Sequence, residues 1–349
     1  MSLKSKKSFL LYASTMPVSG AHQAAIYDLQ RQDVFPIPND LYKLIEKQNE
    51  GVLWGSIVES YDRENVDTIN EYIEFLIKHE LGWWVGEEEK NRFPLLDLSW
   101  DYPGQITNAL VEVGFPSVFN LKKAIQQITF LGGRDIQIQI KNTPTITQLE
   151  QVIAEISTLN VRSIELVVEY CPAFKVEQYS ILKQKNVSVF FLKVCGIPSA
   201  ISKLSFKEEN MFFTTKSIEE ISKDHTIHPS AFSVNIPTFT EAQNHNLYFN
   251  RKLSIDAEGF IKNCPSHAHH FGNIADTKLE AAIEKPGFKD YWFITKDQID
   301  GCKDCEFRYM CVDPATPVDN GKGGWKRPEP CAYDPYTATW KEDIALVNE

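Results

Sequence analysis

The sequence lacks the features that mark several protein classes. It has no apolar run of about 20 residues, so we expect no membrane-spanning helix. It contains no P-loop, dinucleotide fingerprint or G-x-S-x-G elbow. The formal net charge of −11 argues against a nucleic-acid partner, because such partners are bound by neutralising phosphates. With 349 residues, 43% of them hydrophobic, the chain is expected to fold into two or three ordered domains.

A secretory signal is also missing. Lys4, Lys6 and Lys7 precede an apolar run that extends only over residues 9–13, which is too short for the hydrophobic part of a signal peptide. We therefore expect a cytoplasmic protein, whose thiols stay reduced. Reduced thiols that cluster in a sequence favour a metal site over disulfide bonds.

Cysteine is absent before Cys171, yet it is dense near the C-terminus. Four cysteines, which we call the cysteine quartet, follow one another as Cys-x2-Cys-x5-Cys-x19-Cys: Cys302, Cys305, Cys311 and Cys331. The surrounding segment has few aliphatic residues, so we expect it not to fold by burial alone. A bound metal would supply the missing stability, because metal-binding free energy becomes folding free energy. The spacing thus predicts that the quartet is a metal site.

The identity of the metal is open between two alternatives. Structural zinc sites pair two close cysteine doublets, whereas the quartet has one doublet and two single cysteines. Iron–sulfur clusters accept wider and less regular spacing, with four thiolates for one 4Fe–4S cluster. The spacing therefore favours one 4Fe–4S cluster, with zinc as the alternative.

Hydrophobic patterns divide the chain into three predicted domains: 1–90, 91–244 and 245–349. The first has strands at 9–14 and 26–29, a helix starting after a cap at Asn39 or Asp40, and further helices over 57–61 and 69–77. This order suggests a winged-helix-like unit. The third domain begins with a hairpin that turns at 257–259 and continues into the cysteine-rich segment.

The middle domain alternates predicted strands and helices. Apolar runs predict strands at 106–113, 136–140, 164–168 and 187–194, and amphipathic patterns predict helices over 120–131, 145–159 and 174–184. Such alternation implies a parallel sheet covered by helices. Only four strands stand out, so the expected fold class is α/β with a partial βα barrel.

The C-terminal motifs resemble a known family. The stretch NRKLSIDAEGFIKNC, followed by FGNIADTKLEAAI and the Cys-x2-Cys-x5-Cys motif, is similar to the SPASM extension of radical SAM peptide maturases. Together with YDLQR at 27–31 and IPNDLY at 37–42, it resembles the SPASM-domain peptide maturases of grasp-with-spasm systems. The resemblance implies a degenerate radical-SAM-type barrel and a cytoplasmic role in the biosynthesis of ribosomally made peptides (RiPPs). The implied partners are a precursor peptide and an ATP-grasp ligase.

The resemblance also assigns site residues. It implies that the quartet holds the outer SPASM cluster and that Cys264 matches a ligand of the inner cluster. Thr277, and Pro314 or Ala315, stand where further inner ligands are expected, so the inner cluster is not expected to form. The nearby histidines at 267, 269 and 270 offer a Cys-x2-His-x-His metal set, with exposed loop residues as the alternative.

The main departure concerns radical chemistry. The family's Cys-x3-Cys-x2-Cys motif, which holds the cluster that binds S-adenosylmethionine, has no counterpart before Cys171. Gly132 and Gly133 are similar to a cofactor-binding glycine pair, although a loop before a strand explains them equally well. Whether the chain is an enzyme is therefore left open, and no catalytic residue is assigned. A peptide-binding component without radical chemistry is expected; the alternatives are a zinc-stabilised binding module and a radical enzyme with an atypical cluster site.

Overall fold

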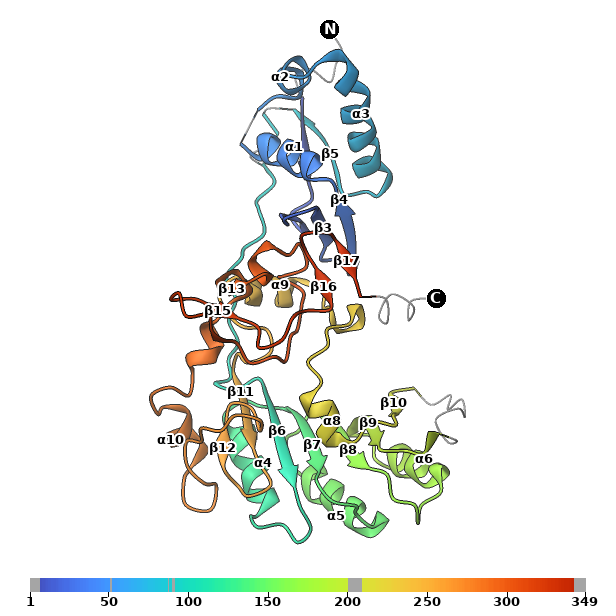
Figure 1. The fold of residues 1–349 in the computed structure, drawn as a ribbon, viewed down its shortest axis with the longest axis vertical. Coiled ribbons are helices and arrows are strands. Elements are labelled where there is room, and N and C mark those ends of the chain that lie inside the picture. The colour runs from blue at the N-terminus through green and yellow to red at the C-terminus, as the bar shows by residue number, and fades with distance from the viewer. Residues whose placement is uncertain (1–6, 51, 87, 90–91, 200–208, 342–349) are drawn as a thin grey trace. The chain divides into compact units, whose positions relative to one another are not determined.

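The structure is a computed structural model that describes residues 7–50, 52–86, 88–89, 92–199 and 209–341 (Figure 1). The chain forms two compact units. Unit 1 comprises residues 1–100, 226–247 and 294–349, and unit 2 comprises residues 101–225 and 248–293. Segment 248–293 therefore packs with the sheet rather than with the cysteine quartet. The three predicted domains, 1–90, 91–244 and 245–349, stay a prediction, because a compact unit of the structure need not be a domain.

Unit 2 is built on one seven-stranded sheet in the order β10-β9-β8-β7-β6-β11-β12. All neighbouring strands are parallel except β11 and β12, which are antiparallel. The strands are β6 (Asn108–Val113), β7 (Asp135–Ile140), β8 (Ser163–Glu169), β9 (Val189–Cys195), β10 (Met211–Phe213), β11 (Lys252–Ile255) and β12 (Ile261–Lys262). The predicted parallel sheet and α/β class are confirmed. Its description as a degenerate radical-SAM-type partial barrel stays an interpretation.

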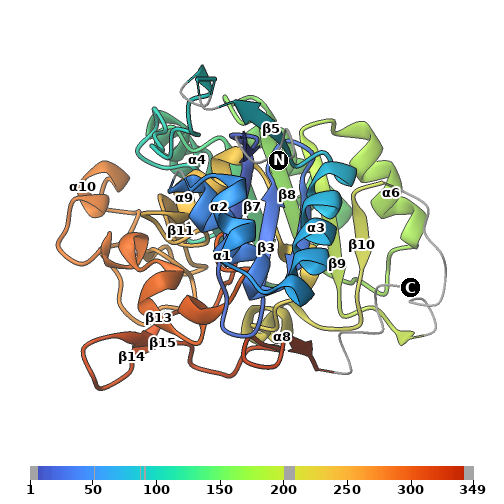
Figure 2. The ribbon, with the colours of Figure 1, turned by 90° about the horizontal axis from the view of Figure 1, so that it is seen from above.

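The helices of unit 2 are α4 (Leu121–Phe130), α5 (Ile146–Ser157), α6 (Val176–Lys185), α8 (Ile218–Lys223) and α10 (Leu279–Ile283), with a 3-10 turn at Asp290–Phe293. Residues of α4, α5, α6 and α10 join the core on one face of the sheet. Ile218 of α8 packs instead against Val167 and Cys195, on the other face. Asn120 caps α4 by accepting a hydrogen bond from the Lys123 amide, and Thr145 forms a capping box with Gln148 at the start of α5. Figure 2 shows β8, β9 and β10 in succession, with α6 alongside.

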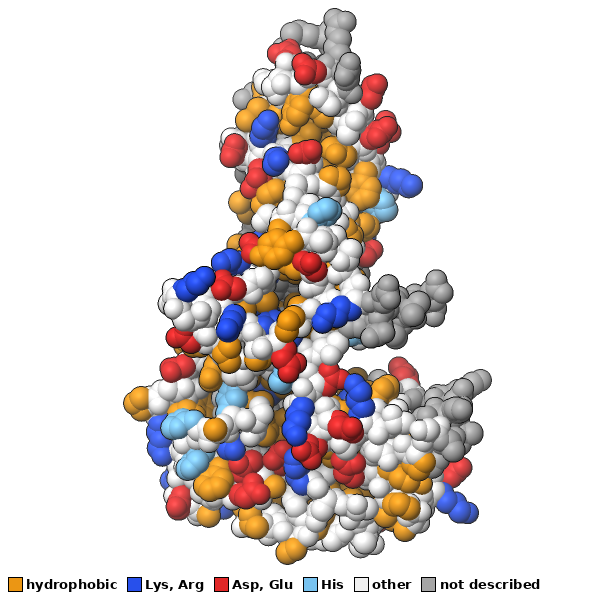
Figure 3. All heavy atoms as spheres, in the orientation of Figure 1, with side chains coloured by type: hydrophobic (Ala, Val, Ile, Leu, Met, Phe, Trp, Pro, Cys, Tyr) orange, Lys and Arg blue, Asp and Glu red, His pale blue; other side chains and the backbone are white. Residues whose placement is uncertain are grey.

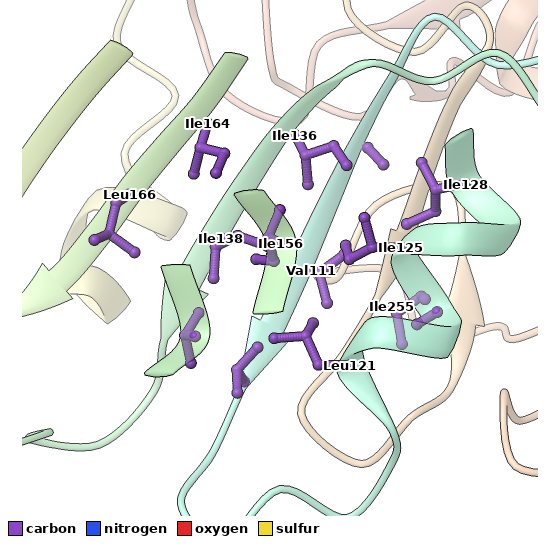
Figure 4. Close-up of a cluster of buried hydrophobic side chains, with 14 of the residues drawn as sticks. Val111, Leu121, Ile125, Ile128, Ile136, Ile138, Ile156, Ile164, Leu166 and Ile255 are labelled. Carbon is purple, nitrogen blue, oxygen red and sulfur yellow. The ribbon is translucent and has the colours of Figure 1, made fainter. Parts of the chain in front are cut away.

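The core of unit 2 follows from strand alternation. In β7 the isoleucines are buried while the intervening Gln137 and Gln139 are half-buried, because successive side chains of a strand point to opposite faces. The isoleucine face meets the apolar faces of α4 and α5, as Figure 4 shows for Ile138, Ile125 and Ile156. The predicted hairpin is confirmed as well: β11 and β12 are joined through Gly259, whose φ is +85°.

The N-terminal part of unit 1 contains two small sheets and three helices. Strands β1 (Lys7–Leu11) and β5 (Gly82–Gly86) form an antiparallel pair, and β2 (Thr15–Val18), β3 (Ala24–Asp28) and β4 (Asp33–Ile37) form an antiparallel sheet. The helices are α1 (Asn39–Asn49), α2 (Trp54–Glu59) and α3 (Arg63–Lys78). Sequence patterns predicted the three helices, β1 and β3, but not β2, β4 or β5. Strands β2 and β4 are short edge strands that contain Pro17 and Pro36. The name winged helix stays an interpretation.

The predicted cap of α1 is wrong. Pro38 is the N-cap, with no side-chain cap hydrogen bond, and Asn39 is the first helical residue. The Asn39 side-chain amide donates instead to the carbonyls of His22, at 3.1 Å, and Ala21, at 3.4 Å. The side chain is therefore used to fix the turn between β2 and β3, a tertiary contact that the helix signal does not reveal.

Strand β3 is buried on both faces and separates two hydrophobic cores. Ala24 and Ile26 face a core that includes residues from α1, α2 and α3. Ala25 and Tyr27 face a second core that includes Phe307, Met310 and Tyr333 from the cysteine-rich segment. The expectation that this segment lacks an apolar core is thus wrong, because aromatic residues and strands β2 and β3 supply one.

The rest of unit 1 is made of short elements. They are α9 (Ile236–Ala242), β13 (Ile299–Asp300), β14 (Val318–Asp319), β15 (Trp325–Lys326), β16 (Tyr333–Asp334) and β17 (Thr339–Trp340), with 3-10 turns at Pro229–Ala231, Lys296–Gln298 and Cys302–Asp304. Strand β15 pairs with β13 and β14, and β16 pairs with β17.

Candidate metal centre

The cysteine quartet lines one cavity. All four cysteines are half-buried free thiols, and together they border a cavity of about 600 Å³ within unit 1. Aromatic and charged side chains complete its wall: Phe232, Phe307, Tyr333, Trp340, Lys296, Arg308, Asp313 and Arg327. The thiols are spread over residues 302–331 of the sequence, so the tertiary fold is what gathers them.

Strand pairing explains how the two ends of the quartet meet. Strands β13 and β15 are parallel, with Ile299 opposite Trp325 and Asp300 opposite Lys326. Parallel strands end at the same edge of a sheet. Cys302, which follows β13, and Arg327, which follows β15, therefore leave the sheet on the same side. Cys331 comes shortly after Arg327, just before β16.

A tight turn places the doublet. Gly301 has a φ of +78°, a conformation that glycine adopts at little cost, and it precedes the 3-10 turn that begins at Cys302. The amide of Cys305 donates to the carbonyl of Cys302 at 3.0 Å, which closes the turn. Cys311 forms an isolated antiparallel bridge with Phe232, which ties the third thiol to a segment far away in sequence.

Without a metal the buried thiols keep their protons, whereas nearby backbone amides would stabilise two of the sulfurs as thiolates once a metal binds. Burial raises the pKa of Cys302 and Cys305, and it raises the pKa of Cys311 to about 12, so these thiols are neutral at neutral pH without a metal. Backbone amides approach two sulfur atoms: Phe307 N lies 3.4 Å from Cys305 Sγ, and Tyr333 N lies 3.5 Å from Cys331 Sγ. Such donors stabilise coordinated thiolates.

A buried ion group adjoins the quartet and carries no signal in the sequence. Lys296 Nζ lies 2.6 Å from Asp313 Oδ2, and Arg327 Nε lies 2.9 Å from the same oxygen. Burial lowers the pKa of Lys296, but Asp313 and the sulfurs of Cys311 and Cys302 outweigh it, so the pKa is raised. The three residues are separated by loops in the sequence, so only the folded structure shows that they form one buried group.

Hydrogen bonds fasten the cysteine-rich segment to the β2–β3 turn. The buried Glu306 carboxylate accepts from Gln23 Nε2 at 2.7 Å and from the Tyr333 hydroxyl. Arg308 donates to the carbonyl of Ser19, and the amide of Ala21 donates to the carbonyl of Asp304 at 2.8 Å. The quartet therefore belongs to the same compact unit as the N-terminal strands.

Cys264 lies in unit 2 and is not part of the cavity wall. It is buried, and its Sγ is 3.3 Å from the Ser266 hydroxyl oxygen. His267 is half-buried between the rings of Phe249 and Tyr291, and burial lowers its pKa to about 4. The other two histidines of the motif, His269 and His270, are exposed.

A further cysteine and the glycine pair have structural surroundings. Cys195 at the end of β9 is buried, and burial raises its pKa to about 11, which suits a structural thiol rather than a nucleophile. Gly132 packs so closely against Gly104 that a Cβ atom on it would lie 2.5 Å from Gly104 Cα. A Cβ on Gly133 would lie 2.8 Å from Ile128. Packing thus accounts for the glycine pair.

Among the described residues, no group of three or more His, Cys, Asp or Glu side chains is arranged to hold a metal ion. A single zinc ion requires four sulfurs at about 2.3 Å from the metal, so its ligands must almost touch. The quartet lines one cavity without such a preformed arrangement, and its binding of zinc or of a cluster stays a prediction.

Two further observations bear on the sequence predictions. In the described part of the chain, no helix is long and apolar enough to cross a membrane. On the face drawn in Figure 3, Lys and Arg side chains are interspersed with Asp and Glu rather than gathered into one basic patch.

Comparisons with known proteins give distant similarity. No protein-family model and no curated protein matches the chain. Among solved structures, native anSMEcpe with bound AdoMet aligns with a TM-score of 0.35 and 10% identity, over 66% of this chain and 94% of that chain. SuiB from Streptococcus suis aligns with a TM-score of 0.32 and 9% identity, over 89% of this chain and 95% of that chain. At these TM-scores neither alignment establishes a shared fold.

Proposed function

We propose that this protein is a SPASM-type component of a peptide-maturation system. In this role it binds a ribosomally made precursor peptide and assists an ATP-grasp ligase. The observation that carries the proposal is the placement of the cysteine quartet around one cavity, which matches the outer SPASM cluster site that the motifs imply. The lack of cysteine before Cys171 separates it from self-sufficient radical enzymes.

The quartet would hold one 4Fe–4S cluster. Such a cluster would supply structural cross-linking, or electron relay, because four thiolate ligands leave no iron open to substrate. This chain's own residues contribute the rest: amides of Phe307 and Tyr333 donate toward sulfur, and Lys296 adds positive charge. Cys264 takes no part in this proposal because it lies outside the cavity wall.

The peptide would bind at the N-terminal sheets by adding a strand to an exposed edge. Residues 25–29 cannot supply this edge, because β3 is paired on both sides, by β2 and β4. Strands β2 and β4 contain proline, which blocks pairing. The β1–β5 pair remains. The exposed rings of Tyr12, just after β1, and Phe93 contact Trp83 of β5, Phe93 edge-to-face.

Metal content tests the cluster. The full chain is purified anaerobically, and iron, acid-labile sulfide and zinc are measured together with the visible absorption spectrum. The proposal expects about four irons and four sulfides per chain and a broad sulfur-to-iron absorption band. Stoichiometric zinc without iron would replace it with the alternative, a zinc-stabilised binding module. Cleavage of S-adenosylmethionine by the loaded protein would instead support a radical enzyme with an atypical site.

Peptide capture tests the partner. Precursor peptides encoded beside this gene are mixed with the tagged full chain, with and without an ATP-grasp ligase encoded there, and retention is measured. We expect the Y12A/F93A double variant to lose retention while Y336A retains the peptide, since Tyr336 is an exposed aromatic of the cysteine-rich segment. Equal retention by both variants would remove the β1–β5 pair as the binding surface.

A further inference from the structure

Several buried cationic side chains line the cavity of the cysteine quartet, and one of them, Lys296, approaches a sulfur atom. The Lys296 side chain is 10% exposed, and its Nζ is 4.0 Å from Cys302 Sγ, within reach of an N–H···S hydrogen bond. Burying a lysine is costly unless a negative group accompanies it. The placement of this ammonium group therefore calls for an explanation.

Asp313 explains the placement only in part. Its carboxylate, 2% exposed, contacts both Lys296 and Arg327 through the same oxygen, Oδ2. Its other oxygen, Oδ1, accepts from the amide of Ala315 at 3.0 Å. One carboxylate shared between two cations neutralises Lys296 incompletely, so positive charge remains next to the sulfurs.

We propose that Lys296 is a positioning residue whose charge sets the reduction potential of the cluster held by the cysteine quartet. This inference rests on the proposed 4Fe–4S cluster. One-electron reduction by an external donor adds one negative charge to the cluster and its thiolates, and a fixed cation nearby stabilises that added charge. The effect is large for Lys296 because the site is buried, where charge interactions are weakly screened.

The negative charge of Asp313 should shift the reduction potential in the direction opposite to that of Lys296. Removing the lysine charge should make reduction harder, whereas removing the carboxylate charge should make it easier. A purely structural role predicts no such opposition, because damage to the site would act on both variants in the same direction. The pair K296M and D313N therefore separates electrostatics from folding.

The experiment is a potentiometric titration of the full chain. Wild type, K296M, K296R, D313N and K303M are loaded anaerobically, checked for iron content, and titrated with dithionite in the presence of redox mediators; reduction is followed by electron paramagnetic resonance. Lys303 is the matched control, since it lies beside the same cysteine doublet but is 48% exposed and paired with Asp300.

We expect a lower potential for K296M, a higher one for D313N, and values close to wild type for K296R and K303M. Equal potentials in K296M and wild type, or shifts of K296M and D313N in the same direction, would overturn the inference while leaving the cluster in place. If K296M fails to bind iron, D313N provides the test: a higher potential supports the inference, and an unchanged or lower potential overturns it. Wild-type protein that binds no iron would overturn both this inference and the proposed cofactor.

Discussion

The hydroxyl of Tyr27 donates a hydrogen bond to the carbonyl of Glu306, with 2.6 Å between the oxygens and 279 positions between the residues. Tyr27 is fully buried in β3, and Glu306 lies between Cys305 and Phe307. This bond joins the N-terminal strands to the cysteine doublet. Deleting residues 1–90 would therefore disturb the quartet as well as the peptide-binding strands, so point variants are the better tests.

Replacing Tyr27 by phenylalanine should destabilise unit 1. The Y27F change leaves the Glu306 carbonyl without this donor, and an unsatisfied buried group costs about 1–2 kcal/mol. Denaturant unfolding measures the loss, with Y12F as the control because Tyr12 is 41% exposed. Equal stability of Y27F and Y12F would show that the bond contributes nothing.

Serine at Cys302 or Cys331 should remove bound metal. Each thiol is one of four around the cavity, and coordination requires all of them. Iron content per chain should fall severalfold in C302S and C331S and stay at the wild-type level in C171S, whose thiol lies in unit 2. Unchanged iron in the quartet variants would contradict the assigned ligand set.

His267 should make the protein less stable in mild acid. Burial lowers its pKa to about 4 from an ordinary 6.5, so the unfolded chain binds the proton first as pH falls. The stabilisation by neutral His267 is complete above about pH 6.5 and is lost as pH falls toward 4. Denaturant midpoints at several pH values should show a weaker decline in H267F than in wild type.

The exposed His269 provides the control for that measurement. H269F changes an exposed ring of the same loop and leaves the buried His267 in place, so it should keep the wild-type decline. A wild-type curve that is flat between about pH 7 and pH 4.5 would contradict the role of His267.

Alanine at Gly132 should destabilise unit 2 more than alanine at Gly287. Both glycines have positive φ, +99° and +89°, so each substitution carries a similar backbone cost of about 1 kcal/mol. A Cβ at 132 would also collide with Gly104 Cα at 2.5 Å, whereas the nearest atom to a Cβ at 287 is 3.7 Å away. Thermal unfolding of G132A should therefore occur well below that of G287A; equal melting would refute the packing explanation of the glycine pair.

Much of the fold could be predicted from local pattern. Strands such as β7, with isoleucine at alternate positions, and helices such as α5, with its capping threonine at 145, are determined by periodicity and capping. Strands β2 and β4 were not predicted because each is short and contains a proline. Proline is tolerated in an edge strand, and the sequence does not show which strands lie at an edge.

The candidate site divides in the same way. The quartet could be predicted from cysteine spacing alone, because metal coordination favours particular spacings of thiol ligands in a sequence. Lys296 and Asp313 carry no such signal, since lysine and aspartate are common on surfaces and only burial makes these two unusual. The predicted third domain, 245–349, contains both Cys264 and the quartet, but the pairing of β11 with β6 assigns the neighbourhood of Cys264 to unit 2.

The sequence by itself determined the α/β alternation of the middle of the chain, the helices near the N-terminus and the four thiols. These features depend on residues close together in the sequence and on short periodic patterns, so they can be recognised from the sequence itself. Tertiary structure alone decided that β3 carries two cores, that Tyr27 reaches Glu306, and that a buried lysine lies beside Cys302. Most of those relationships join positions far apart in the chain, and they exist only once folding has offset the entropy of closing the loops between them.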